Sequence, residues 1–215
     1  MATNSAELIY KAAIASYVNP VYEAKQQAEA AHLGATIGLD ENGRPLSPVQ
    51  KIEKYFSLID TEGKRKVTAK DLAAAWLSRV ADPTDNDLQL IAREIDRFMK
   101  IADLDADGCV SLNEYLNYML TLITERDEGK RFEIHGLLAE KCVGDPTLME
   151  NLLQWFLEHD VVGEGEISID AFRAILDKVK HKKKVQIHES VFTQRTVGYA
   201  QYVLLMLGRD RKSVV

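Results

Sequence analysis

The sequence predicts an all-α fold, a compact array of paired helix–loop–helix units with short β-bridges between their loops. Two observations indicate it. Three segments align on an aspartate that follows an apolar helix, at Asp60, Asp103 and Asp160. In each segment a β-branched residue stands seven residues after that aspartate, where its side chain can pair with its counterpart in a neighbouring loop. Units that bury one face of their helices must pack together, so we expect pairs.

The bulk composition is that of a globular chain. Its 215 residues with 46% hydrophobic content can form a sizeable core. The longest candidate for a membrane span, Val203–Leu207, is far shorter than the ~20 residues a bilayer helix needs. No secretory signal is recognisable, and Ala2 excludes N-myristoylation. Two cysteines, Cys109 and Cys142, have no metal-ligand spacing and fit a reducing compartment, so we expect a cytoplasmic protein.

Charge is divided unevenly along the chain, whose net charge is −6. Residues 173–215 hold ten Lys and Arg against three Asp and Glu, a net +7, which leaves −13 on residues 1–172. We expect the basic tail to lie on the acidic body of the same protein and expect no nucleic-acid partner. The tail also offers apolar residues for a self-docked helix, namely Val197, Tyr199, Val203, Leu204, Met206 and Leu207.

Residues 1–45 are predicted to be an N-terminal helical extension. The stretch up to Gly34 is Ala-rich with Glu and Lys, and Asn19-Pro20 would break it into two helices. Residues 40–44 are typical of a turn. Residues 46–122 are predicted to form the first pair of units, and residues 123–215 a third unit with a C-terminal helix.

The starts of the helices are marked by capping residues. Ser47 can cap a helix that begins at Pro48, and Gln50 completes a capping box. Thr84 in Pro83-Thr84-Asp85 and the pair Asp145-Pro146 precede the second and third units. If each aspartate is position 1 of a loop, large apolar residues recur five and four residues before it and at position 13. Position 8 carries Val67, Val110 and Ile167, and we expect Val67 to pair with Val110.

The second loop, residues 103–114, carries the chemistry. Its oxygen-bearing residues recur at the offsets needed to wrap a cation, and Gly108 permits the sharp turn between them. The predicted metal ligands are the side chains of Asp103, Asp105, Asp107, Ser111 and Glu114 and the main-chain carbonyl of Cys109. Calcium prefers six to eight such hard oxygens, and it would convert the repulsion among four carboxylates into attraction.

The loop resembles the calcium loop of the EF-hand family at every diagnostic position. The resemblance implies that Ca²⁺ is the cofactor, with Mg²⁺ as a possible competitor, and that the protein binds rather than catalyses. The first loop resembles the same pattern, but Lys64, Arg65 and Asp71 stand where ligands or the turning glycine belong, so we expect no calcium there. In the third loop Val162 and Ala171 remove two ligands, and we expect a structural loop or a weak calcium or magnesium site.

A fourth, incomplete hand is predicted at the end of the chain. In this interpretation Tyr202–Leu207 is the entering helix, Gly208 is position 1, and Val215 pairs with Ile167. From about Leu46 the chain resembles the sarcoplasmic calcium-binding protein and calerythrin group in its widely spaced and partly degenerate hands. That resemblance implies a calcium buffer or a calcium-responsive sensor.

Two other functions are open. A basic cluster at Lys178, Lys180 and Lys182–Lys184, with the terminal Ser213-Val214-Val215, is compatible with an adaptor that contacts a membrane or a scaffold. A photoprotein-like ligand binder would use an aromatic cavity lined by Trp76, Trp155, Tyr115, Tyr118 and His159. The histidines at 135, 181 and 188 show no ligand spacing and are interpreted as surface residues.

Overall fold

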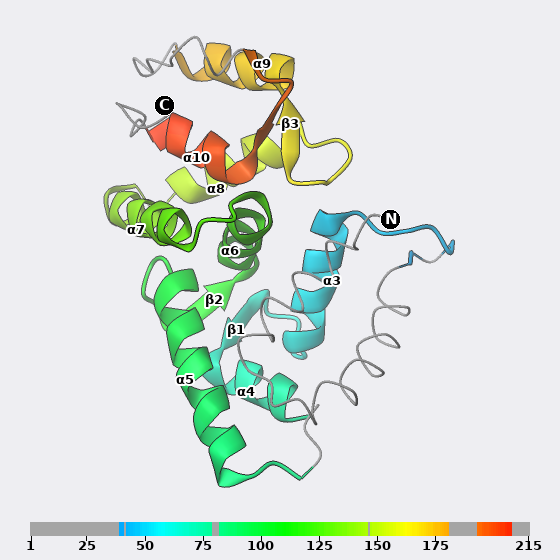
Figure 1. Cartoon of the computed structure of the whole chain (residues 1–215), viewed down its shortest axis with the longest axis vertical. Helices are drawn as coiled ribbons and strands as arrows, with labels where there is room; N and C mark the ends of the chain where they lie inside the picture. Colours follow the sequence, from blue (N-terminus) through cyan, green and yellow to red (C-terminus); the bar gives the residue numbers. More distant parts are fainter. Residues whose placement is uncertain (1–38, 41, 79–81, 146, 181–192, 208–215) are drawn as a thin grey trace. The chain divides into compact units, whose positions relative to one another are not determined.

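The computed structural model describes residues 39–40, 42–78, 82–145, 147–180 and 193–207 (Figure 1). Within these residues the fold is helical with two small sheets, which confirms the predicted fold class. None of the described helices is long and apolar enough to cross a bilayer. The elements are, in order, α3 (Pro48–Ile59), β1 (Lys66–Thr68), α4 (Ala69–Leu77), α5 (Asp85–Ala102), β2 (Cys109–Ser111), α6 (Leu112–Thr124), α7 (Glu128–Gly144), α8 (Leu148–Leu157), β3 (Glu166–Ser168), α9 (Ile169–Lys180), β4 (Thr196–Gly198) and α10 (Tyr199–Leu207).

The chain divides into two compact parts, an N-terminal part up to Met119 and a C-terminal part from Leu120. We expected the division after residue 122, and both positions lie within α6. Each part contains one antiparallel pair of short strands, β1 with β2 and β3 with β4. Each part is therefore organised around its own strand pair.

The predicted capping signals are present in the N-terminal part. The hydroxyl of Ser47 accepts a hydrogen bond from the N–H of Gln50, and the Gln50 side chain accepts one from the N–H of Ser47, so α3 begins at Pro48 as predicted. Thr84 caps α5 in the same reciprocal way with Asp87. The turn predicted at residues 40–44 is also confirmed, because the Asp40 carboxylate accepts hydrogen bonds from Asn42 and Arg44.

The three loops share one backbone conformation although their side chains differ. Position 4 has a positive φ in each loop, at Gly63, Ala106 and Gly163. Position 6 does as well, at Arg65 with φ 57°, Gly108 with φ 83° and Gly165 with φ 82°. Arg65 adopts this left-handed conformation at a cost that glycine would not incur. The loop path has therefore been retained where the cation ligands have been lost.

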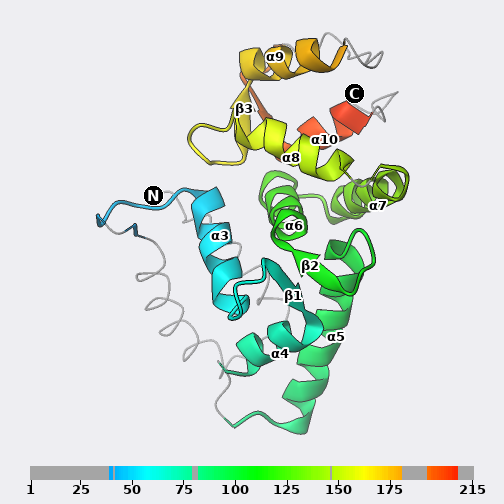
Figure 2. The same cartoon turned by 180° about the vertical axis from the view of Figure 1, so that it is seen from behind.

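The strand pair of the N-terminal part joins the first and second loops. Val67 lies opposite Val110, as predicted, and both side chains are fully buried. Figures 1 and 2 show β1 and β2 side by side in both views. Phe56 of α3 packs on Tyr115 of α6 with ring centroids 5.3 Å apart, so the helices that flank the two loops share one core. The first hand thus supports the second directly.

The C-terminal part corrects the predicted fourth hand. Ile167 pairs with Val197, not with Val215, so the predicted pairing is wrong. The helix Tyr199–Leu207 leaves the strand and is therefore an exiting rather than an entering helix. With Val197 as position 8, position 13 is Tyr202, which matches the large apolar residue of the other three units. The described part of this loop contains no acidic residue that would mark it as a metal loop. The sequence pattern therefore placed the fourth loop too close to the end of the chain.

The apolar tail segment docks on its own chain, as predicted. Val197, Tyr199 and Val203 are fully buried, and α10 packs on α7 and α8. The Tyr202 hydroxyl donates a hydrogen bond of 3.1 Å to the Leu152 carbonyl, and its ring lies 5.1 Å from that of Phe156. This segment is part of the core of the C-terminal part.

His135 was interpreted as a surface residue, and this is wrong, because only 6% of it is exposed on α7. Helix α7 packs on both α8 and α10, so a residue on its inner face is buried whatever its polarity. Several other predictions lie outside the described residues: the helices of residues 1–38, His181 and His188, most of the basic cluster, and the tripeptide Ser213-Val214-Val215.

Candidate metal centre

The second loop lies between two helices whose ends supply its first and last acidic residues. Asp103 is the C-terminal cap of α5, and Glu114 lies in the first turn of α6. Strand β2 lies between them and holds the second half of the loop against β1. The two ends of the loop are therefore fixed by α5 and α6, and its second half is fixed by the strand pair.

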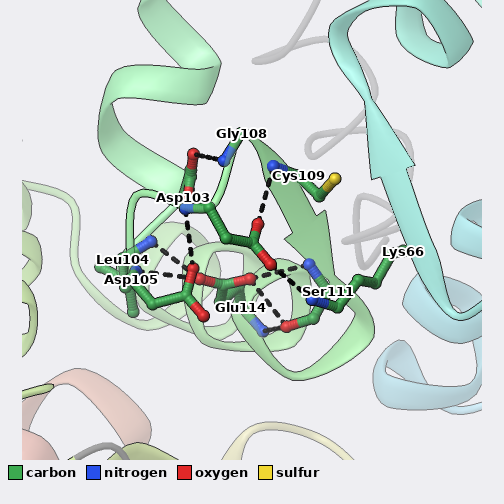
Figure 3. Close-up of polar contacts among 9 residues, drawn as sticks. Lys66, Asp103, Leu104, Asp105, Gly108, Cys109, Ser111 and Glu114 are labelled. Carbon is green, nitrogen blue, oxygen red and sulfur yellow. Dashed lines mark hydrogen bonds and ion pairs between the residues drawn. The ribbon is translucent and has the colours of Figure 1, made fainter.

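Three carboxylates converge in this loop. One oxygen from each of Asp103, Asp105 and Glu114 lies within 4.8 Å of the others (Figure 3). Asp105 is exposed, Asp103 is half-buried and Glu114 is only 3% exposed. The described residues contain no other such group of three acidic, His or Cys side chains. Like charges this close repel one another, and a divalent cation would offset that repulsion.

Glu114 is held by four hydrogen bonds. Its Oε1 accepts from the N–H groups of Leu104 at 2.8 Å and Asp105 at 3.4 Å. Its Oε2 accepts from both the N–H and the hydroxyl of Ser111, each at 2.7 Å (Figure 3). The Ser111 hydroxyl in turn accepts from the Glu114 N–H, so the two residues cap α6. The last acidic residue of the loop is thus oriented by the loop itself.

Two further backbone N–H groups of the loop point at Asp103 and Asp105. Asp103 accepts from the N–H groups of Asp107 at 3.1 Å and Gly108 at 3.0 Å, and Asp105 accepts from Asp107 at 3.1 Å. Partial burial raises the pKa of Asp103, and the neighbouring carboxylates of Asp105 and Asp107 raise it further, while the two backbone donors oppose that rise. The loop therefore concentrates negative charge in a partly dehydrated place.

Asp107 differs from the other three carboxylates. Its Oδ1 accepts from the Cys109 N–H at 2.8 Å, and its Oδ2 forms an ion pair with Lys66 Nζ at 2.5 Å. The hydrogen bond and charge of Lys66 lower the pKa of Asp107. Asp107 is not a member of the converging group. The structure therefore brings three of the four predicted acidic ligands together and pairs the fourth with a lysine of the first hand.

The other two predicted ligands lie in β2. Ser111 faces Glu114, as described above, and Cys109 is a half-exposed free cysteine whose partner across the strands is Thr68. That all six residues bind the ion remains a prediction. Lys66 is the residue that the ligand search missed. The sequence contained a signal for Lys66. Lys66 stands at position 7 of the first loop, and the predicted pairing of Val67 with Val110 places Lys66 beside the second loop.

The first and third loops use their acidic residues for internal hydrogen bonds. Asp60 accepts from the N–H groups of Lys64 and Arg65, and Asp71 accepts from the N–H and hydroxyl of Thr68 at the start of α4. In the third loop Asp160 is 6% exposed and accepts from three successive N–H groups, of which that of Gly165 is the last. In the first and third loops, hydrogen bonds within the protein therefore maintain the shape of the loop.

The donor set of the second loop fits calcium. Carboxylate, hydroxyl and carbonyl oxygens are the hard ligands that Ca²⁺ takes, and a twelve-residue loop with a bidentate glutamate at its end is the arrangement that supplies enough of them. The three converging side chains are all carboxylates, and none is a thiolate or an imidazole of the kind that typically binds zinc. The fold and the loop define a helix–loop–helix protein of the calcium-binding kind.

Comparison with known proteins agrees. Residues 49–120 match the family described as EF-hand domain pair, which indicates that Ca²⁺ is the cofactor. The matched stretch begins within α3, ends within α6 and includes the two loops joined by β1 and β2. The resemblance to the sarcoplasmic and calerythrin group stays a prediction.

Two relatives illustrate the similarity. The chain is 26% identical over 140 residues to Polcalcin Cup a 4 of Hesperocyparis arizonica, across 60% of this chain and 81% of the relative. It is 31% identical over 145 residues to an endoplasmic reticulum-resident calcium binding protein of Plasmodium falciparum (isolate 3D7), across 58% of this chain and 40% of that protein. The second match thus spans less than half of the relative's length.

Proposed function

We propose that the protein binds one Ca²⁺ ion per chain in the loop of residues 103–114 and acts as a calcium-responsive sensor. The convergence of Asp103, Asp105 and Glu114 is the observation that supports this most strongly. Calcium is favoured over Mg²⁺ because a flexible oxygen cage suits the larger ion, whereas Mg²⁺ demands a strict octahedron and retains its water. Mg²⁺ is expected to compete only weakly.

A sensor is favoured over a buffer for two reasons. One intact loop in a 24.2 kDa chain gives little buffering capacity. The loop is also joined to the first hand, because β2 pairs with β1. A change at its carboxylates can therefore be transmitted to Val67 and α4. The degenerate hands agree with our proposed placement near the sarcoplasmic and calerythrin group. Neither Cys109 nor Cys142 is in a disulfide, which supports a cytoplasmic site of action.

A photoprotein-like role is less well supported. Tyr115 and Tyr118 both pack edge-on against Phe98, and His159 Nδ1 lies 2.9 Å from the Trp155 carbonyl oxygen. Core packing and a local hydrogen bond account for these side chains, so we propose binding without catalysis. Membrane or scaffold contact through the basic tail remains a prediction.

Calorimetric titration with Ca²⁺ tests the proposal. We expect a stoichiometry of one for the unmodified chain and no measurable binding for Glu114→Gln, because the substitution replaces one of the two carboxylate oxygens that a bidentate ligand supplies and removes its charge. Asp71→Asn is the matched control, since Asp71 occupies the same position in the first loop, and it should leave the stoichiometry at one. A stoichiometry of two or three, or loss of binding in Asp71→Asn alone, would contradict the proposal.

A further inference from the structure

Lys66 places a positive charge from one hand inside the acidic loop of the other. It lies in β1 opposite Ser111 of β2, and its side chain reaches the second loop (Figure 3). Its Nζ forms an ion pair with Asp107 Oδ2, and half of its side chain remains exposed. The neighbouring Lys64 behaves differently, because it pairs with Glu62 of its own loop. Two lysines of one loop thus serve different carboxylates.

The ion pair occupies a carboxylate that calcium is expected to need. Asp107 stands at position 5 of the loop, its Oδ1 accepts from the Cys109 N–H, and its Oδ2 accepts from Lys66. Asp103, Asp105 and Glu114 converge without it. An ammonium group at this point supplies part of the positive charge that the clustered carboxylates require. An incoming Ca²⁺ ion must displace the Lys66 ammonium or bind beside it. Either event makes the free energy of Ca²⁺ binding less favourable.

We propose that Lys66 is an affinity-determining residue, a tethered cation that competes with Ca²⁺ for Asp107 and is released when the ion binds. The inference rests on the proposed calcium site at residues 103–114. Its consequence is that the first hand, through Lys66, responds to the occupancy of the second loop, because release frees the Lys66 ammonium from its ion pair with Asp107. It also means that the first hand sets the calcium concentration to which the second responds.

The affinity test compares Lys66→Met with Lys64→Met. Both variants remove one positive charge from the same loop, but only the first removes the contact with Asp107. We expect Lys66→Met to bind Ca²⁺ about two- to ten-fold more tightly at low salt, because an exposed ion pair and one nearby like charge are lost. Lys64→Met should stay close to the unmodified protein. The gain should shrink as salt screens the charge, and Lys66→Arg should retain the original affinity.

A second readout follows the released amine directly. The rate of amine labelling at Lys66, measured by mass spectrometry, should rise when Ca²⁺ is added, while the rate at Lys64 should not. Weaker binding by Lys66→Met would overturn the inference, because it would mean that Lys66 holds Asp107 ready for the ion. Unchanged labelling of Lys66 would overturn it as well. If instead the unmodified chain binds no Ca²⁺, or binding survives Glu114→Gln, the proposed function itself fails.

Discussion

At the scale of single residues, the loops show that backbone and ligands are determined separately. Gly108 and Gly165 take the left-handed conformation easily, yet Arg65 takes it too, at the equivalent place in the first loop. The Asp60 carboxylate accepts from the N–H groups of Lys64 and Arg65, as Asp103 and Asp160 do from the equivalent N–H groups of their own loops. A loop can therefore keep its path after losing the glycine and the ligands that a motif search looks for.

Another residue-scale consequence concerns His135 and acid. Burial on α7, with a smaller contribution from Arg131, lowers the pKa of His135 from 6.5 to about 4. The folded protein therefore keeps this imidazole neutral where the unfolded chain protonates it. The resulting stability is fully present above pH 6.5 and is lost as the pH falls toward 4, and at pH 5 the loss should reach about 2 kcal/mol.

Chemical denaturation of calcium-free protein at pH 7.5 and pH 5 checks this prediction. The variant His135→Gln stays neutral at both values, so its free energy of unfolding should fall less than that of the unmodified chain by about the same 2 kcal/mol. A proton NMR titration of the His135 ring should give a midpoint well below 6. Parallel losses in the two proteins, or an ordinary midpoint, would show that burial does not govern this group.

At the scale of elements, the exiting helices are capped in different ways. In α4 and α6 the residues at positions 9 and 12 cap each other, Thr68 with Asp71 and Ser111 with Glu114. Helix α10 follows Gly198, which has no side chain to offer. Its Ala200 N–H instead donates a hydrogen bond of 3.0 Å to the Thr124 hydroxyl at the end of α6. A residue distant in the sequence has taken over the capping role.

We predict that Thr124→Val destabilises the C-terminal part by about 1–2 kcal/mol, because it leaves the Ala200 N–H without its acceptor in a partly buried place. Valine has the same shape as threonine, so the contacts that Thr124 makes beside Gly198 are kept. Thr124→Ser retains the hydroxyl and serves as the control. Denaturant unfolding would measure both variants, and equal stability of Thr124→Val and the unmodified chain would exclude a capping role.

At the scale of the whole molecule, the two parts carry strand pairs with the same register but different chemistry. Val67 opposite Val110 belongs to a pair that contains the acidic loop. Ile167 opposite Val197 belongs to a pair whose third loop keeps Asp160, Glu164 and Ser168 at side-chain ligand positions and lacks acidic residues at positions 3 and 12. Asp160 is already committed to three backbone donors. Under the proposed function, the first pair responds to Ca²⁺ and the second serves as structure.

Hydrogen exchange should show this division. On adding Ca²⁺ we expect slower exchange in peptides covering residues 60–71 and 103–114, because the ion orders the second loop and β2 holds β1. Peptides covering residues 160–171 should change little, since their loop is held by its own hydrogen bonds. Glu114→Gln should abolish the slowing. Equal slowing in β3 and β4 would contradict a response restricted to the first pair.

Sequence alone was sufficient for the features that depend on neighbouring residues. The helical spacing, the capping box at Ser47 and the acidic loop were predicted, because periodicity, caps and loop spacing are local properties. The pairing of Val67 with Val110 was predicted from the repeat, which places a β-branched residue at the same position of each loop. Tertiary contacts decided the rest. The partner of Ile167, the burial of His135 and the ion pair of Lys66 with Asp107 each depend on which segments meet in space. Local patterns do not encode these long-range contacts, since a strand of three residues can pair with any suitable strand and only packing selects its partner.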